Sequence, residues 1–447
     1  MTRLVVRGGL LVRPDRVEAG DLVVEEGRFV AVGGTHRGEG TEVDAGGLVV
    51  LPGGVDSHVH LMDPGPTERE DFPTGTAAAS ARGVTTIVEH THAHPVRSVT
   101  DLRAKLSHLD GRANVDFALA AHLWPEDVAG MGDLWEAGVA FFKLFTCTTH
   151  GVPGLAASHL LDAFESLAQM DGRALVHCED ETITETAERR LKQMGRTDPG
   201  LLVEWRNREA ELAAVAVVGV LALATGAKVT VAHVSNPKVA ALIDQLRRLG
   251  GDVAAETCPQ YLTLRESEVV EHGAFRKFTP PARIVSDLDE ETMWALLRDG
   301  TFTHLSTDHA PSTVDQKRAG TIWEAPFGLP GLDTTYPFLI DAALSGRLDW
   351  TDVARLYAAY PADRYGLAPR KGRLAEGSDA DFVLVDPAGS WTVTAADVIS
   401  KAGWSPFEGR SFRGKVVGTY LRGRPIADEG GPYDLRTGSF LPGAGRR

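Results

Sequence analysis

The chain has 447 residues, of which 43% are hydrophobic and 24% charged, and its formal net charge is −15. This composition is typical of a globular protein with ample material for a core, which excludes a disordered chain. The negative charge argues against nucleic-acid binding, because that binding depends on clustered lysines and arginines that displace the counterions of the phosphates. We therefore expect a small-molecule partner and no nucleic acid.

No targeting or membrane segment is indicated. Residues 1–7 contain charged side chains and lack an apolar stretch of signal-peptide length. No window approaches the roughly 20 apolar residues of a membrane-spanning helix. The cysteines Cys147, Cys178 and Cys258 are far apart and include no C-x-x-C pair, so neither a disulfide framework nor a zinc knuckle is indicated. We expect a soluble protein of the cytoplasm without a membrane contact.

The two ends of the chain have the same pattern of short strands. Near the N-terminus, strands separated by turns are expected at 4–6, 10–12, 22–24 and 29–32. Near the C-terminus, 381–385 and 415–421 are strand-like and bounded by glycines. We predict that residues 1–50 and 370–447 together form one β-sandwich domain, with the glycine-rich part after Asp428 as a surface extension.

Between these ends, over residues 51–369, short apolar strands alternate with longer helical stretches such as 156–170, 209–224 and 237–249. This alternation is typical of a parallel sheet with crossover helices. Eight strands are expected, and they end near His58, Glu89, Ala120, Phe145, His177, His233, Glu256 and Asp308. Eight such units predict an α/β fold of the TIM type, a (β/α)₈ barrel, which commonly forms one unit of about 250 residues.

Six polar side chains lie at the ends of these predicted strands. They are His58, His60, Lys143, His177, His233 and Asp308. In a barrel of this kind the chemistry lies at the C-terminal ends of the strands, where the loops converge. We therefore expect all six to face one mouth of the barrel.

The histidines are candidate metal ligands. His58 and His60 are two residues apart, so on a strand both rings project to the same side and can ligate one ion. Alone, such a pair is a weak signal, since two surface or core histidines give the same pattern. His177 and His233 are each the first polar residue after an apolar strand. Two more histidines in equivalent positions are hard to explain as satisfied core residues.

Lys143 and Asp308 have more than one interpretation. Lys143 lies in the apolar run 139–145, where a buried ammonium is costly. It either pairs with a carboxylate or is chemically altered, because a desolvated lysine can add carbon dioxide to form a carbamate that two cations share. Asp308 ends the last predicted strand, where a carboxylate can bind a metal and shuttle a proton. Its alternative role is to cap the next helix.

The order H-x-H, Lys, His, His, Asp on a barrel, with LPGGVD at 51–56 and GSDAD at 377–381, resembles the cyclic amidohydrolases. This family contains hydantoinases, dihydropyrimidinases, allantoinases and dihydroorotases, and the resemblance covers nearly the whole chain. It implies a metal-dependent enzyme that opens a cyclic amide. It also implies a homo-oligomer, a tetramer or a dimer.

The resemblance also implies a role for each ligand in a centre of two divalent metal ions, with zinc the expected one. His58 and His60 would bind one ion together with Asp308. His177 and His233 would bind the second, and Lys143, carboxylated by carbon dioxide, would bridge both. A hydroxide between the ions would attack the amide carbon, and Asp308, the catalytic residue, would protonate the departing nitrogen.

The ring to be opened is left undecided between hydantoin-like, dihydropyrimidine-like and allantoin-like ureides. Dihydroorotases carry H-x-H-x-R, whose arginine binds the substrate carboxylate, but Met62 replaces that arginine here and His92 replaces an asparagine. The loss of this bidentate clamp argues against dihydroorotate. The stretch around Cys258 resembles hydantoinases, whereas Thr148 replaces their oxyanion-stabilising tyrosine and the F-K-x-F-x-C stretch resembles allantoinases.

Met62, His92, Thr148 and Cys258 are therefore the candidate substrate-binding residues. His90, His92 and His94 fit no member of the family well. Alternate residues at a strand end share a face, so they could contact substrate, bind an adventitious metal or lie in a solvated loop. The stretch 323–330 looks like a lid or pocket wall, although its apolar residues could equally be packing.

Other functions fit the same residues. A dihydroorotase is one alternative, and a non-catalytic scaffold of the dihydropyrimidinase-like kind is another, although such scaffolds have lost ligands that are all present here. A third is a different hydrolase on the same metals, for example one that acts on open-chain N-acyl amino acids.

Overall fold

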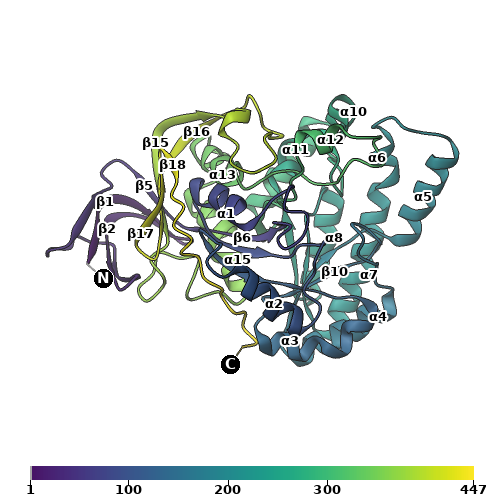
Figure 1. The fold of residues 1–447 in the computed structure, drawn as a ribbon, viewed down its shortest axis with the longest axis horizontal. Coiled ribbons are helices and arrows are strands. Elements are labelled where there is room, and N and C mark those ends of the chain that lie inside the picture. The colour runs from purple at the N-terminus through teal and green to yellow at the C-terminus, as the bar shows by residue number, and fades with distance from the viewer. Residues whose placement is uncertain (1–2, 447) are drawn as a thin grey trace.

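Strands from both ends of the chain pair in one sheet, which lies beside a larger body of parallel strands and helices (Figure 1). The computed structural model describes residues 3–446. Among these residues no helix has the length and apolar character that a membrane crossing needs.

The terminal sheet has nine strands in the order β18-β17-β16-β15-β5-β1-β2-β3, with β4 beside β1. Their bounds are β1 Leu4–Val12, β2 Val17–Glu25, β3 Arg28–Val32, β4 Thr41–Asp44, β5 Val49–Pro52, β15 Phe382–Thr392, β16 Ser411–Leu421, β17 Arg424–Asp428 and β18 Gly431–Pro432. The two ends of the chain meet where β5 pairs antiparallel with β15. All nine strands belong to one hydrogen-bonded sheet, so the sandwich arrangement and the domain boundaries stay predictions.

The larger body contains two sheets of parallel strands, with the orders β14-β13-β12-β11-β10-β9 and β6-β7-β8. The bounds are β6 Gly54–Val59, β7 Val84–Glu89, β8 Asp116–Leu119, β9 Ala121–His122, β10 Phe142–Phe145, β11 Arg173–His177, β12 Lys228–Val231, β13 Val253–Thr257 and β14 His304–Leu305. Most of their residues are buried and apolar, as expected for parallel strands covered on both faces. The predicted alternation of parallel strands and helices is confirmed.

The helices lie around these strands (Figure 1). Their bounds are α1 Phe72–Ala81, α2 Val99–Leu109, α3 Met131–Ala137, α4 Ala157–Gln169, α5 Glu181–Gln193, α6 Leu201–Trp205, α7 Arg208–Thr225, α8 Pro237–Arg248, α9 Pro259–Thr263, α10 Glu266–His272, α11 Asp287–Arg298, α12 Val314–Arg318, α13 Thr335–Leu344, α14 Trp350–Ala354 and α15 Tyr360–Arg364. The edges of the two parallel sheets lie close together. The amide of Ala140 donates to the carbonyl of Leu119 (2.8 Å), and the amide of His60 donates to that of His309 (2.8 Å).

Helix caps fix the chain directly after two of the site strands. Asp180, three residues after His177, accepts a hydrogen bond from the amide of Ile183 and begins α5. Asn236, three residues after His233, caps α8 in the same way. Side-chain caps of this kind typically stabilise a helix by about 1 kcal/mol. Each histidine is therefore held between a buried strand and a capped helix.

The C-terminal segment packs beneath the parallel strands rather than extending over the surface (Figure 1). The amide of Leu441 donates to the carbonyl of Phe117 (2.7 Å), and Leu441 is only 2% exposed. A Cβ atom at Gly438 would lie 2.0 Å from the carbonyl oxygen of Val115, so glycine permits this close approach. The prediction of a surface extension after Asp428 is wrong for this stretch.

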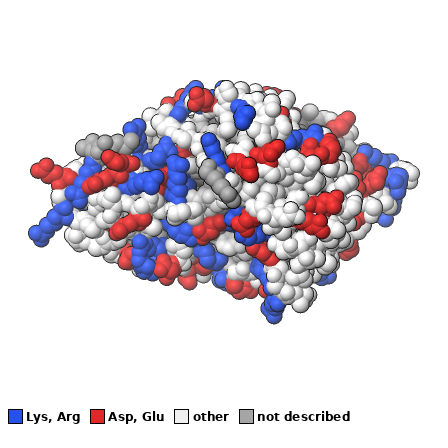
Figure 2. Space-filling view, turned by 90° about the horizontal axis from the view of Figure 1, so that it is seen from below, with Lys and Arg blue, Asp and Glu red and all other residues white. Residues whose placement is uncertain are grey.

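Charged side chains of both signs are interspersed over the face shown in Figure 2. Ion pairs are common among the charged residues of the molecule, for example between Arg97 and Asp127 and between Arg364 and Asp252. Pairing extends into the interior, where Lys105 binds Glu89. Cations in this molecule therefore generally have an acidic partner.

The most deeply buried ion cluster joins the parallel strands to the terminal sheet. The ammonium of Lys371 lies 2.6 Å from Asp116 on β8, 2.7 Å from Asp381 and 2.9 Å from Asp379. All four side chains are at most 4% exposed. Burial alone would lower the pKa of Lys371, but the three carboxylates raise it to about 12.

We expect Lys371→Met to lower the free energy of unfolding by about 3–5 kcal/mol, because it leaves the buried carboxylate of Asp381 without a counter-charge. Asp116 keeps its pair with Arg422, and Asp379 keeps its pair with Arg370. Denaturant unfolding of the variant and the parent measures this loss. Because the folded-state pKa of Lys371 is raised from 10.5 to about 12, its stabilisation is complete below pH 10.5 and is lost as the pH rises through 12. The control is Lys415→Met, which removes an exposed pair with Glu429 and should cost less than about 1 kcal/mol. Equal losses in the two variants would contradict the prediction.

Candidate metal centre and cavity

The six predicted ligands meet at the C-terminal ends of the parallel strands. The carboxylate of Asp308 lies 3.1 Å from Nε2 of His58 and 3.4 Å from Nε2 of His60. The amine of Lys143 lies 3.4 Å from Nε2 of His58. Nδ1 of His177 is 3.0 Å from Nε2 of His233, and the rings of His58 and His233 are centred 5.5 Å apart.

Hydrogen bonds orient His58 and His60 for ligation. Nδ1 of His58 lies 2.7 Å from a carboxylate oxygen of Glu256, and Nδ1 of His60 lies 2.8 Å from the carbonyl oxygen of His90. A carbonyl or carboxylate oxygen only accepts, so each Nδ1 carries the proton and each Nε2 presents a lone pair. Both lone pairs face the group formed by Asp308 and Lys143, as a metal site requires.

His177 presents its other ring nitrogen. Its Nε2 donates to Glu179 (2.8 Å), so Nδ1 is left with the lone pair that faces His233. Burial would raise the pKa of Glu179, but Arg206 and His177 together with a hydrogen bond from Thr279 lower it to about 2, so this carboxylate is ionised. A cation between the two facing ring nitrogens would be ligated by both.

The donor set fits metal ions. His58, His233 and Asp308 each offer a ligand atom, and these atoms lie within 4.8 Å of one another. His58 forms a similar group with His60 and His90. Imidazole nitrogens and a carboxylate are the ligands that zinc prefers when thiolates are absent.

Lys143 has the surroundings that favour a neutral amine. It is 1% exposed, and burial lowers its pKa to about 8. Among residues 3–446 no carboxylate oxygen lies within 4.0 Å of its Nζ atom. The alternative of a buried ion pair is therefore not formed, and the lysine lies beside the ligand group without a partner of opposite charge in contact.

Four residues around the site hold left-handed backbone conformations that are unusual for residues other than glycine. The φ angles are 37° at His233, 50° at Asp308, and 54° at both Met62 and His150. Such conformations typically cost about 1–3 kcal/mol each and persist where the surrounding structure enforces them. A left-handed residue directs its side chain differently from an extended strand residue, so the backbone at these four positions sets where the side chains point.

A cavity of about 320 Å³ opens beside the ligands. The stretch 323–328 forms part of its wall, which agrees with the expectation for this segment. Other residues that line it are Met62, Arg69, His92, His150, Lys277 and Asp308. The volume is at the lower end of the range for small-molecule sites, about 300–1,000 Å³.

Two of the four candidate substrate-binding residues lie at the cavity, and the other two do not. Met62 and His92 line the cavity. Thr148 lines a separate surface hollow beside Glu181. Cys258 is fully buried, with its sulfur 3.7 Å from the hydroxyl of Ser306. Only the first two are therefore in a position to touch a molecule in this cavity.

The three clustered histidines separate in space. His90 is 1% exposed, its ring is centred 4.7 Å from that of His58, and neither of its ring nitrogens has a hydrogen-bond partner in the described part of the chain. His92 stacks on His150 at the cavity, with ring centres 4.7 Å apart. His94 is exposed and lies in an outer hollow. The expectation that His90, His92 and His94 would share one face, as alternate residues of a strand do, is therefore not met.

Sequence reasoning missed three cavity residues, Arg69, His150 and Lys277. Each lies in a loop, outside the apolar runs that mark the strands. Their only signal was indirect, because loops that follow the strands of such a fold are expected to surround the site.

This fold and this group of side chains define a metal-dependent hydrolase. The chain belongs to the amidohydrolase family, whose model matches residues 49–426. It is 37% identical to an allantoinase of Rubrobacter xylanophilus over 98% of this chain and 97% of that protein, and 32% identical to an allantoinase of Solibacter usitatus over 95% and 94%.

Solved structures agree with this assignment. The chain matches the L-hydantoinase (dihydropyrimidinase) of Arthrobacter aurescens with a TM-score of 0.93 and 29% identity, over 99% of this chain and all of that one. A D-hydantoinase matches with a TM-score of 0.90 and 26% identity, over 99% of each chain. The resemblance to the cyclic amidohydrolases is confirmed, and the chain is an enzyme of that group that hydrolyses cyclic amides.

Proposed function

We propose that the enzyme opens the ring of a cyclic ureide, of the hydantoin, dihydropyrimidine or allantoin kind, at a centre of two metal ions. The observation that carries this proposal is the meeting of six ligand side chains beside a cavity of about 320 Å³. We also propose that the two parallel sheets form a single (β/α)₈ barrel, supported by the hydrogen bonds between their edges. A cytoplasmic homo-oligomer stays an expectation from the sequence.

The ligands divide into two sets. His58, His60 and Asp308 would hold one ion, and His177 and His233 would hold the other. Two bound zinc ions supply positive charge that acidifies a water molecule and polarises the ring carbonyl. Lys143 lies beside His58, and its lowered pKa of about 8 leaves a fraction of the amine neutral at pH 7. That form can add carbon dioxide, release a proton and offer two carboxylate oxygens.

Asp308 is the group that moves a proton. Its carboxylate contacts both histidines of the first set, and its side chain is 14% exposed to the cavity side. Hydrolysis adds the oxygen of water to the amide carbon and breaks the bond to the ring nitrogen. Asp308 can accept the proton that the water loses and deliver it to the departing nitrogen, which yields an open ureido acid.

A substrate panel with and without metal tests the proposal. Hydantoin, dihydrouracil, allantoin and dihydroorotate are assayed for ring opening with zinc, manganese or cobalt. We expect about two zinc ions per chain and a mass gain of about 44 Da on Lys143 under gentle conditions. Chelation should lower the rate at least about 100-fold, and added zinc should restore it. Ring opening that survives complete metal removal would refute the two-metal mechanism.

A further inference from the structure

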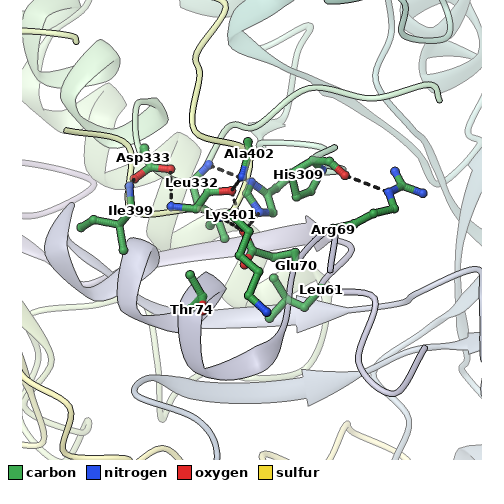
Figure 3. A network of polar contacts seen from close by, with 12 residues as sticks. Leu61, Arg69, Glu70, Thr74, His309, Leu332, Asp333, Ile399, Lys401 and Ala402 are labelled. Carbon is green, nitrogen blue, oxygen red and sulfur yellow. Dashed lines mark hydrogen bonds and ion pairs between the residues drawn. The ribbon is translucent and has the colours of Figure 1, made fainter. Parts of the chain in front are cut away.

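Arg69 lines the cavity with a guanidinium that no carboxylate of the described residues contacts. It follows β6 in the loop that leads to α1, and its Nε donates to the carbonyl of Pro311 (3.0 Å). Burial lowers the pKa of Arg69 and the charge of Glu68 raises it, although Glu68 does not contact the guanidinium. The two other acids next to Arg69 in sequence are engaged elsewhere. Glu70 accepts from Ser400 and from the amide of Lys401, and Asp71 binds the ammonium of Lys401. Figure 3 shows the Arg69 guanidinium pointing away from this network.

Lys277 is a second cation of this kind at the cavity. Its ammonium donates to the carbonyls of Ile322 (2.7 Å) and Trp323 (3.0 Å) and lies 4.4 Å from the centre of the Phe327 ring. Two of its three N–H donors are therefore used. Burial lowers the pKa of Lys277 to about 8, so it is still mostly protonated at pH 7.

The acids near the cavity do not neutralise these cations. Within residues 3–446, neither Arg69 nor Lys277 has a carboxylate oxygen within 4.0 Å. Asp308 belongs to the ligand group, and Glu324 accepts hydrogen bonds from the amide and hydroxyl of Thr321. Lys317, buried behind the wall, also donates only to carbonyls, those of 277 and 326.

Arg69 and Lys277 differ from the other buried cations in lining the cavity. Arg247 and Arg283 also donate only to carbonyls, but neither lines it. The buried ammonium of Lys105 binds Glu89, and that of Lys371 binds three aspartates. A buried or half-buried charge without a partner is costly, so proteins rarely keep one unless a ligand supplies the opposite charge. At the cavity an anionic ligand would be in a position to supply that opposite charge to both cations.

We propose that Arg69 and Lys277 form an anion-binding side of the cavity, and that the substrate is a cyclic ureide that also carries a carboxylate outside its ring amides. This inference rests on the proposed function, which supplies the ring and its hydrolysis. The guanidinium presents a planar fork of donors that matches a carboxylate, and Lys277 adds its remaining N–H. Met62 occupies the position two residues after His60 at which dihydroorotases have their carboxylate-binding arginine. In this chain Arg69, in the loop that follows, supplies a cation instead.

The test compares two compounds that differ in charge and hardly in shape. These are hydantoin-5-propionate and its primary amide, assayed with the zinc-loaded enzyme. We expect kcat/KM for the acid to exceed that for the amide at least about tenfold, because hydrogen bonds between charged partners are the strong ones. Arg69→Gln should reduce this ratio to near one, mainly through a higher KM for the acid. Arg69→Lys, which keeps the charge but loses the fork, should give an intermediate ratio.

The matched control is Arg97→Gln, an arginine of the neighbouring hollow that is paired with Asp127 and Glu126. It should keep the parental ratio of acid to amide. Equal kcat/KM for acid and amide in the parent, or an unchanged ratio in Arg69→Gln, overturns the anion-binding side while leaving ring opening established.

If neither compound is hydrolysed, hydantoin ring opening fails as the activity, and the same comparison is made by calorimetric binding to the zinc-loaded protein. Tighter binding of the acid, lost in Arg69→Gln, still supports the anion-binding side. Equal affinities, or binding of neither compound, overturn it.

Discussion

Lys143→Ala is expected to lower kcat/KM for ring opening at least about 1,000-fold and to reduce the zinc content below two ions per chain. The lysine is the candidate ligand that we propose to bridge the two sets of histidines. Its amine is 3.4 Å from His58 and has no carboxylate within contact distance in the described chain. Without the lysine, nothing at this position can offer oxygens to both ions.

Elemental analysis, intact mass under gentle conditions and steady-state kinetics on the best substrate of the panel measure these losses. The matched control is Lys228→Ala, a partly exposed lysine of β12 that pairs with Asp171 and should keep both metal and rate. A Lys143→Ala enzyme with two zinc ions and parental turnover would eliminate the bridging role.

Asp308→Asn is expected to lower kcat about 100- to 10,000-fold, which is the usual contribution of a positioned acid or base. Asparagine has nearly the same shape, so the loop should keep its conformation. Its amide can neither accept the proton of the attacking water nor deliver one to the departing nitrogen. It is also a weaker metal ligand than a carboxylate, and the zinc content has to be measured alongside.

The control for position 308 is Asp315→Asn, an exposed aspartate on α12. This substitution should change kcat less than about twofold, because substitutions at exposed positions away from a functional site usually have small effects. If Asp308→Asn keeps its zinc and its kcat stays within tenfold of the parent, another group transfers the proton.

The repeating elements were predictable because local patterns decide them. The expected helices at 156–170 and 237–249 appear as α4 and α8 within one residue at each end. Apolar runs of four to six residues mark the parallel strands, since their two faces are both buried. His177 and His233 could be noticed for the same reason, because each follows such a run directly, and Lys143 because it interrupts one.

The loops were less predictable because tertiary contacts decide them. Thr148 and Cys258 were chosen from the resemblance to hydantoinases, but the chain turns Thr148 toward Glu181 and buries Cys258 against Ser306. Arg69 gave no signal, because its missing acidic partner is a property of the folded molecule. The left-handed backbone at His233 and Asp308 is likewise enforced by the surroundings rather than by residue type.

The pairing of β5 with β15 determines when the terminal sheet can form during translation. About 330 residues separate Pro52 from Phe382, so a ribosome needs roughly 15–65 seconds to make the partner after the first strand has emerged. For that interval the peptide groups at one edge of β5 have no partner strand, and such open edges invite pairing with other chains. The sheet shared by the two ends therefore closes only after all the parallel strands have been made.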